Sequence, residues 1–292
     1  VWRGGYEYKI NQIIGFSHIH SWTMGGLLTM PVTGPLKIKP GEENEPDSGY
    51  RSRINHKNEK ASLSYYSVLL DDYNIKAELT STTRTGFQRY TFPKSDSSRI
   101  LFDLENGSEY PYEVRWASIS KVSDYEIEGF STQSSYDEPT NLLNDYTVYF
   151  VARVDKPMKS FGTWVNGYVD TTSSICWGRH DIGAFMNFDT EEGEIIQLKT
   201  AISYVSIEQA RKNLEVESGG FGWNFDAVRK YAVNEWRKIL STIEIEGGTE
   251  EDKRKFYTNL YRSYCSRTIF SDVDGQYVDM YAVSYPHLRA HE

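Results

Sequence analysis

The sequence predicts a mainly β protein, in which a large antiparallel β-sandwich (a supersandwich) is followed by a short α-helical linker segment. Three observations support this fold class. From residue 61 onward, short segments with strand character recur about every 10 to 15 residues, a rhythm typical of sandwiches and barrels. Aromatic residues make up 14% of the chain, which suits β-strands. Near residue 205 the apolar residues begin to recur at three or four positions, which indicates helices.

Composition limits the classes of partner. A chain of 292 residues can form one large core or two domains. Its net charge of -9 disfavours nucleic acid and anionic membrane surfaces, whereas neutral glycans remain compatible. The sequence has no apolar run of the roughly 18 residues that a membrane span requires. We expect Cys176 and Cys265 to be buried free thiols, with a single disulfide bridge as the alternative.

The strands are predicted in chain order from alternation and turn residues. Residues 1–14 contain alternating apolar positions that indicate an edge strand, and residues 35–53 form a surface loop, either a solvated connector or the rim of a site. Further strands are expected at residues 65–70, 75–82, 87–92, 99–104, 113–119, 125–130, 146–154, 160–165, 183–188 and 194–205. Turns are expected at residues 71–72, 85–86, 106–107, 156–157 and 192–193.

Capping residues mark three helices after the strands. Ser206 with Gln209 has the capping-box pattern, and Asn224 is a good N-cap for a second helix. That helix is expected to continue to the glycines before Thr249, which with Asp252 caps a third helix. We therefore place a domain boundary near residue 205.

The densest group of chemically useful side chains lies in residues 15–34, GFSHIHSWTMGGLLTMPVTG. His18, His20 and Trp22 alternate, so in an extended chain their side chains would share one face. Two imidazoles beside an indole suit a sugar, because they combine hydrogen-bonding edges with a flat apolar surface. The alternative is that Trp22 is a core aromatic residue and the histidines are structural.

Several other residues have both a structural and a functional interpretation. Cross-strand ion pairing on the solvent face is expected for Glu78, Arg84 and Arg89, with sugar or interdomain contacts as the alternative. Core packing is favoured over a binding platform for three more tryptophans: Trp116, Trp164 and Trp177.

Asp272 and Asp274 stand two positions apart before Gly275. They could belong to a calcium loop, but the other ligands of an EF-hand do not follow. They could also be a glycosidase pair, but neighbouring loop carboxylates seldom keep the roughly 6.5 to 9.5 Å that inverting hydrolysis uses. A turn is therefore the preferred interpretation.

Three blocks together resemble one enzyme family. They are GFSHIHSWTMGG at residues 15–26, ASLSYYSVLLDDYNIKAELTSTTRTGFQRYTFP at residues 61–93, and FYTNLYRSYCSRTIFSDVDGQY at residues 256–277. The chain resembles glycoside hydrolase family 92, whose members are calcium-dependent, inverting, exo-acting α-mannosidases. The resemblance implies an N-terminal β-sandwich domain in residues 1–205, a helical linker and the start of the (α/α)6 catalytic domain in residues 206–277, and an atypical tail in residues 278–292.

The resemblance also suggests which residues meet the substrate. Trp22 resembles the family's N-terminal-domain tryptophan that reaches over the domain interface to contact the mannoside, and His18, His20 and Ser21 would accompany it. Members with α-1,2 specificity often have glutamate where this chain has Ser21, so the linkage preference stays open. The family's acid, base and main calcium ligands belong to the remainder of the barrel, so we assign neither a catalytic nor a metal-ligating residue here.

From the resemblance we expect the N-terminal part of an exo-α-mannosidase that acts on N-glycans or mannans in the periplasm or outside the cell. Its partners would be mannose-containing glycans and the C-terminal catalytic domain, which would hold Ca²⁺. We expect these 292 residues alone to be inactive. The alternative is a free-standing, non-catalytic carbohydrate-binding or structural sandwich domain.

Overall fold

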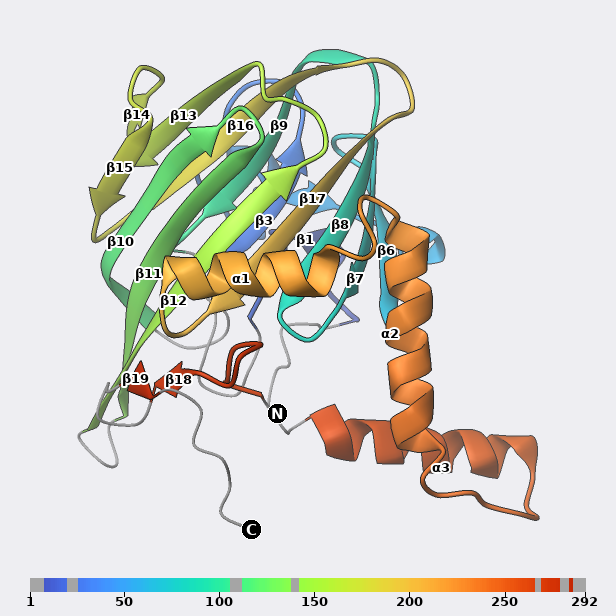
Figure 1. The fold of residues 1–292 in the computed structure, drawn as a ribbon. Coiled ribbons are helices and arrows are strands. Elements are labelled where there is room, and N and C mark those ends of the chain that lie inside the picture. Colours follow the sequence, from blue (N-terminus) through green and yellow to red (C-terminus); the bar gives the residue numbers. More distant parts are fainter. Residues whose placement is uncertain are drawn as a thin grey trace.

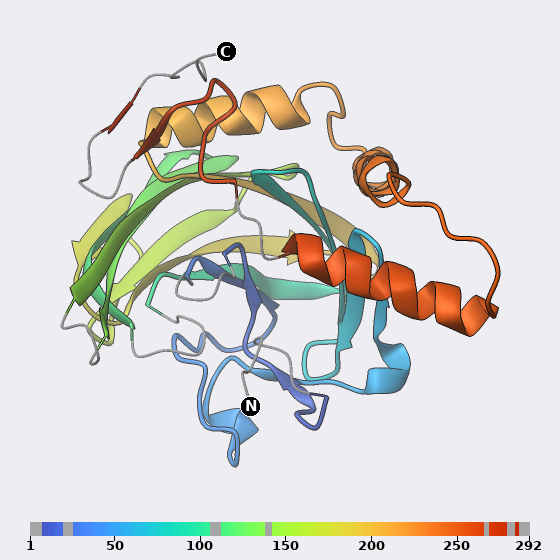
Figure 2. The ribbon, with the colours of Figure 1, turned by 90° about the horizontal axis from the view of Figure 1, so that it is seen from below.

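The computed structural model describes residues 8–19, 26–105, 112–137, 142–265, 269–278 and 284–285. Within them, two antiparallel sheets stack face to face as a sandwich (Figures 1 and 2). The larger sheet has, in spatial order, β15 (Ile175–Gly178), β10 (Tyr112–Ser123), β11 (Glu126–Asp137), β12 (Leu142–Val154), β17 (Glu194–Ser203), β8 (Thr85–Phe92), β7 (Ile75–Ser81), β6 (Tyr65–Leu70) and β5 (Lys60–Ser62).

The smaller sheet has, in spatial order, β14 (Tyr168–Asp170), β13 (Ser160–Val165), β16 (Ile182–Thr190), β9 (Ser95–Asp103), β3 (Leu28–Val32) and β2 (Phe16–Ser17). Two short pairs stand apart: β1 (Gln12–Ile13) with β4 (Ser52–Arg53), and β18 (Tyr277–Val278) with β19 (Ser284–Tyr285). Alternating side chains of both sheets fill one continuous apolar core, which includes Met30, Phe102, Phe150 and Phe188. The predicted β-sandwich is confirmed.

Two local predictions were wrong. Residues 8–9 form a turn and β1 has only two residues, so the described part of residues 1–14 does not form the expected edge strand. Thr85 and Gly86 lie inside β8, and the turn comes earlier, where the backbone N–H of Thr82 donates to the carbonyl of Thr85 at 2.9 Å. Gly86 is a strand residue and not a turn residue, and glycine suits it because the side chain of His18 lies close to its Cα.

Three α-helices follow β17: α1 (Ile207–Ser218), α2 (Phe225–Leu240) and α3 (Glu250–Cys265). The predicted caps are confirmed: Ser206 accepts from the N–H of Gln209, and Asn224 accepts from that of Ala227. α2 ends at Leu240, before the predicted glycines. None of the described helices is both long and apolar enough to cross a membrane.

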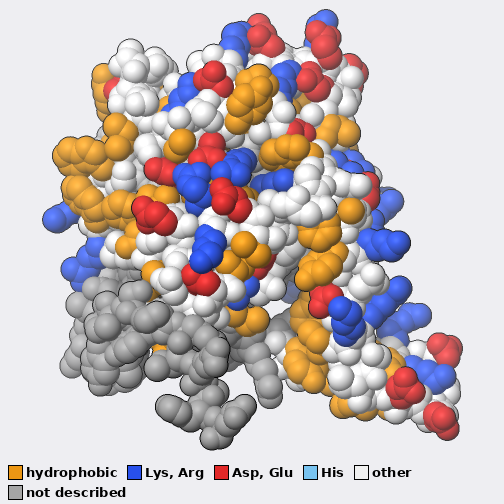
Figure 3. Space-filling model, viewed as in Figure 1, with side chains coloured by type: hydrophobic (Ala, Val, Ile, Leu, Met, Phe, Trp, Pro, Cys, Tyr) orange, Lys and Arg blue, Asp and Glu red, His pale blue; other side chains and the backbone are white. Residues whose placement is uncertain are grey.

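α1 lies across the outer face of the larger sheet, over β12 and β17 (Figure 1). Its Ala210 and Leu214 are buried against Val151 and Ala201. Charged residues of both signs surround this contact (Figure 3). Among them, Arg211 of α1 pairs with Glu126 and Glu128 of β11. The helix is therefore held by an apolar stripe flanked by ion pairs.

α2 covers the outer side of β7 and β8, where Glu78 and Arg89 stand opposite each other. The predicted cross-strand pair is confirmed, with Arg89 Nε at 3.0 Å from Glu78 Oε2. The prediction that this ion pair lies on the solvent face was wrong. Phe225 packs against the guanidinium of Arg89, and Glu78 is only 6% exposed. Burial alone would raise the pKa of Glu78, but hydrogen bonds, chiefly from Arg89, outweigh it and lower the pKa to about 2.

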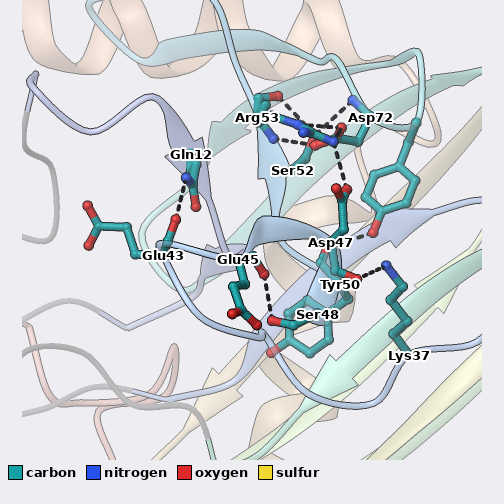
Figure 4. Close-up of polar contacts among 11 residues, drawn as sticks. Gln12, Lys37, Glu43, Glu45, Asp47, Ser48, Tyr50, Ser52, Arg53 and Asp72 are labelled. Atoms are coloured by element: carbon teal, nitrogen blue, oxygen red, sulfur yellow. Dashed lines mark hydrogen bonds and ion pairs between the residues drawn. The ribbon is translucent and has the colours of Figure 1, made fainter.

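Residues 35–53 form the predicted loop, but the sandwich anchors it firmly (Figure 4). Arg53 Nε donates to Asp72 Oδ1 at 2.7 Å, and its guanidinium also pairs with Asp47 at 2.8 Å. Tyr50 is buried in the core. The loop contains the short 3₁₀ turn η1 (Pro46–Ser48). A second 3₁₀ turn, η2 (His56–Asn58), follows soon after the loop ends.

The tryptophan predictions divide. Trp164 is buried in the core, as expected. Trp116 and Trp177 are 38% and 62% exposed, so the prediction of core packing was wrong for both. They lie on the outer face of β10 and β15, and β15 is an edge strand.

Candidate substrate-contact region

Only part of residues 15–34 can be placed. Residues 15–19 and 26–34 belong to the described structure, whereas His20, Ser21 and Trp22 lie outside it. The expected common face of His18, His20 and Trp22 therefore stays a prediction. His18 shows how the sandwich holds the two ends of the intervening segment.

Ser17 and His18 join the two ends. The Ser17 hydroxyl lies 2.5 Å from the carbonyl oxygen of Ile19 and 3.1 Å from that of Gly26. The backbone N–H of His18 donates to the carbonyl of Leu27 at 3.3 Å. The chain therefore leaves and re-enters the sandwich at one point, and we call these five residues the stem.

Both ring nitrogens of His18 bind protein groups. Nδ1 lies 3.0 Å from the carbonyl oxygen of Leu27, which can only accept, so we assign the proton to Nδ1. Nε2 then accepts from the Gln88 amide at 2.9 Å. Burial, opposed only in part by the bond to Leu27, lowers the pKa of His18 to about 4, so the imidazole is neutral at pH 7. A Cβ on Gly86 would lie 3.0 Å from the ring, which is why glycine suits that strand position.

The hydrogen bonds continue into the core between the sheets. Gln88 Oε1 accepts from Thr29 Oγ1 at 2.9 Å and from the hydroxyl of Tyr90. All three side chains are buried. Burial raises the pKa of the Tyr90 hydroxyl, so it stays protonated and donates. Satisfied buried polar networks of this kind are rigid, and this one ties the stem to β3 of one sheet and β8 of the other.

Gly26 meets a third part of the sandwich. Its φ is +124°, a conformation that favours glycine, and a Cβ there would lie 2.4 Å from the amide nitrogen of Gln133 on β11. Gln133 is buried and its Oε1 accepts from the hydroxyl of Tyr146 at 3.0 Å. The end of the stem is therefore constrained by shape as well as by hydrogen bonds.

This arrangement assigns His18 a supporting position, since its ring nitrogens are already used. The sequence patterns did not single out Ser17, Gln88 and Gln133. The available signal was a glutamine at an inward position of β8 and another on β11, where apolar residues are the rule.

The second polar cluster is the turn that contains Asp272. The N–H of Asp272 donates to the carbonyl of Gln276 at 2.7 Å, which confirms the predicted turn. Its buried carboxylate accepts from Ser203 at 2.8 Å and from the Asn213 amide at 2.6 Å. Burial raises the pKa of Asp272, against the effect of these hydrogen bonds. Asp274 pairs with Lys212 at 2.7 Å.

These carboxylates do not fit a calcium ion, because protein donors already occupy them. Among the residues that the structure describes, no three His, Cys, Asp or Glu side chains are grouped so that they could hold a metal. Cys176 is a buried free thiol, and burial raises its pKa to about 11, so it is unreactive at pH 7. The side chain of Cys265 lies outside the described part of the chain.

Arg84 makes a third junction. Its guanidinium pairs with Glu217 of α1 at 2.8 Å, and its Nε donates to the carbonyl of Ser271 at 2.7 Å. Arg84 therefore joins the sheet to both α1 and the Asp272 turn, rather than lying in a solvent-facing cross-strand pair as the sequence suggested.

Comparison with known proteins agrees with this architecture. The sequence model of the glycosyl hydrolase family 92 N-terminal domain matches residues 1–203, and that of the family's catalytic domain matches residues 209–289. The second match extends through most of the range 278–292 that the sequence analysis set apart. A solved family GH92 alpha-mannosidase from Bacteroides thetaiotaomicron is 31% identical with a TM-score of 0.87, over 98% of this chain and 38% of that one. It has also been solved with mannoimidazole.

Two further relatives are more distant. A family GH92 inverting mannosidase from the same bacterium shares the fold, with 23% identity and a TM-score of 0.77 over 97% of this chain and 37% of that one. An uncharacterized secreted glycosidase of Arthroderma benhamiae is 23% identical over 90% of this chain and 36% of its own length. The chain thus spans little more than a third of these relatives. Since the N-terminal-domain model alone matches residues 1–203 of 292, the chain belongs to glycosyl hydrolase family 92.

Proposed function

We propose that this chain is the N-terminal part of an inverting exo-α-mannosidase that hydrolyses α-mannosides of N-glycans or mannans. It contributes substrate contacts and neither the acid nor the base. Family membership supports the reaction class, and the similarity to a mannosidase solved with mannoimidazole supports the substrate class. The secreted relative supports a site of action in the periplasm or outside the cell.

The observation that carries the proposal is the stem. Ser17 and His18 bring the ends of the Trp22-bearing segment together, and Gln88 fixes them to the core. A residue that stacks on a sugar must keep its position when the sugar arrives, because ordering it then would reduce affinity. In our proposal Trp22 contacts the mannoside, with His20 and Ser21 beside it.

The acid and the base that hydrolyse the glycosidic bond would come from residues beyond those that the structure describes. In inverting hydrolysis one carboxylic acid protonates the leaving oxygen while a carboxylate activates water on the opposite face of the sugar. Calcium held by the catalytic domain would help to distort the sugar. The described residues of this chain act by positioning the segment that carries Trp22.

Three assays test the proposal. The 292-residue chain should release no mannose from α-mannobiosides. In the enzyme that carries the catalytic domain as well, Trp22→Ala should lower kcat/KM on the order of 30-fold, the cost of losing a central aromatic contact. Tyr168→Ala, at an exposed aromatic residue on β14, is the control and should change little.

NMR should show β-mannose as the first product; initial α-mannose, or full activity of Trp22→Ala, would contradict the proposal.

A further inference from the structure

Two tryptophans form an exposed pair on the outer face of the larger sheet. The ring centroids of Trp116 and Trp177 are 5.3 Å apart and their planes differ by 31°. Figure 3 shows hydrophobic side chains gathered over β10 and β15, at the left of the view. Apolar side chains gathered on one exposed face mark interaction sites, whereas single exposed ones are ordinary.

The backbone holds this pair rigidly. Trp177 stands opposite Ser118 in the β10–β15 ladder, and its neighbour Cys176 points into the core, so Trp177 must point outward. A register shift between Val114 and Trp116 turns the second indole to the same side. Bulges of this kind re-aim side chains, and here the result is a platform set before any ligand arrives.

Polar groups border the platform. The guanidinium carbon of Arg179 lies over the ring of Trp116, 6.0 Å from its centre, so its N–H donors stand above that end of the platform. His180 follows it with an exposed side chain. An apolar face edged by donors matches a sugar, which presents C–H groups on its ring face and hydroxyls around its rim.

Size and charge favour a short stretch of a neutral glycan chain over a protein or a nucleic acid. The two indoles together expose on the order of 200 Å², well below the roughly 800 Å² that each partner buries in a stable protein–protein interface. The net charge of -9 disfavours polyanions.

We propose that Trp116 and Trp177 form a second, non-catalytic glycan-binding platform for α-linked mannose chains. The platform lies on the outer face of the sheet, whereas the stem contacts Gln88 and Gln133 on its inner face. A polysaccharide held there keeps its chain ends near an exo-acting site. The platform rests on the proposed function only for the choice of mannose.

The test is native gel electrophoresis of the 292-residue chain in gels that contain soluble α-mannan, with xylan and β-glucan gels alongside. We expect α-mannan to retard the chain, and Trp177→Ala and Trp116→Ala each to weaken the binding about tenfold, as is typical of central aromatic contacts. Tyr168→Ala, which removes an exposed aromatic residue from another strand, should bind as the unaltered chain does. Circular dichroism confirms folding, and Trp177→Gln serves as a second variant.

The platform would be overturned by no retardation in α-mannan, or by unchanged retardation of both tryptophan variants. Stronger retardation by xylan or β-glucan than by α-mannan would also overturn it. Trp22→Ala separates the two proposals, because it should lower kcat/KM of the enzyme that also carries the catalytic domain, yet weaken gel retardation of the 292-residue chain less than Trp177→Ala does. Loss of retardation in Trp22→Ala with full retardation in Trp177→Ala would assign mannan binding to the stem segment and refute the platform.

Discussion

At the scale of single residues, His18 shows how burial decides what a side chain can do. An imidazole in water is a good hydrogen-bonding partner for a sugar, but here Leu27 and Gln88 occupy both of its nitrogens. Its ring is kept neutral because a charged imidazole would lose hydration in this position. The residue therefore stabilises the stem, and that stabilisation depends on pH.

We expect acid to weaken the protein through His18. The pKa of this residue is about 4 in the folded chain and 6.5 in the unfolded chain, so the unfolded state binds a proton first as the pH falls. The stability that depends on a neutral His18 is complete above pH 6.5 and is lost progressively down to about pH 4. The loss of unfolding free energy relative to pH 7 is roughly 2 to 3 kcal/mol at pH 4.5. Urea unfolding at pH 7 and pH 4.5 measures it.

His18→Gln cannot titrate and should lose less stability than the unaltered chain between these two pH values. His180→Gln is the matched control, because the side chain of His180 is exposed, and it should behave as the unaltered chain does. An equal acid response of His18→Gln and the unaltered chain would contradict the assignment.

At the scale of elements, the buried Asn213 is a central link between the Asp272 turn, α1 and β17, beside the direct bond from Ser203. Asn213 donates to the carbonyl of Ile202 at 2.9 Å and to Asp272 at 2.6 Å, and its Oδ1 accepts from the N–H of Val273 at 3.0 Å. These contacts connect the residues that follow α3 to the sandwich, although α3 itself stands away from it (Figure 1).

Asn213→Ala should destabilise the chain by about 2 to 4 kcal/mol, because it leaves buried polar groups and part of a buried carboxylate without partners. Hydrogen exchange of residues 271–276 should rise with it. The exposed Asn259 on α3 provides the control variant Asn259→Ala, which should change neither property. Unchanged exchange in Asn213→Ala would show that other contacts hold the turn.

At the scale of the whole molecule, the sandwich and α1 form one stability unit. Ala210 and Leu214 cover an apolar strip of the outer sheet face, and Arg211 balances Glu126, whose side chain is nearly buried. α3, by contrast, contacts mainly α2, through the edge-to-face pair of Trp236 and Tyr261 at 4.7 Å.

A chain that ends at residue 205 should therefore lose roughly 5 kcal/mol of unfolding free energy, since burial of each large apolar side chain contributes about 1.5 to 3 kcal/mol. It should also self-associate through the uncovered strip. A chain that ends at residue 246 keeps α1 and α2 but loses the Asp272 turn, so it should lose about 2 to 4 kcal/mol, as Asn213→Ala does, and should not self-associate because α1 still covers the strip. Thermal melting and size-exclusion chromatography provide the comparison; equal melting temperatures for the 205- and 292-residue chains would refute the single unit.

Local patterns in the sequence were enough to predict most elements. β6 and β13 begin and end where alternation places them, and Ser206 and Asn224 cap helices as their positions indicate. These features depend on neighbours within about four positions, whose interactions the sequence displays directly. The resemblance of residues 15–26 and the two later blocks likewise identified the family, which the comparisons confirm.

Tertiary structure alone decided which faces are covered. Glu78 and Trp177 occupy similar outward strand positions, yet α2 packs beside the first and nothing in the described structure packs over the second. The stem is equally non-local, since Gln88 and Gln133 reach it from strands far away in sequence. Burial and hydrogen bonding between distant segments depend on how the two sheets and the helices pack together. The periodicity of residues within one strand does not contain that information.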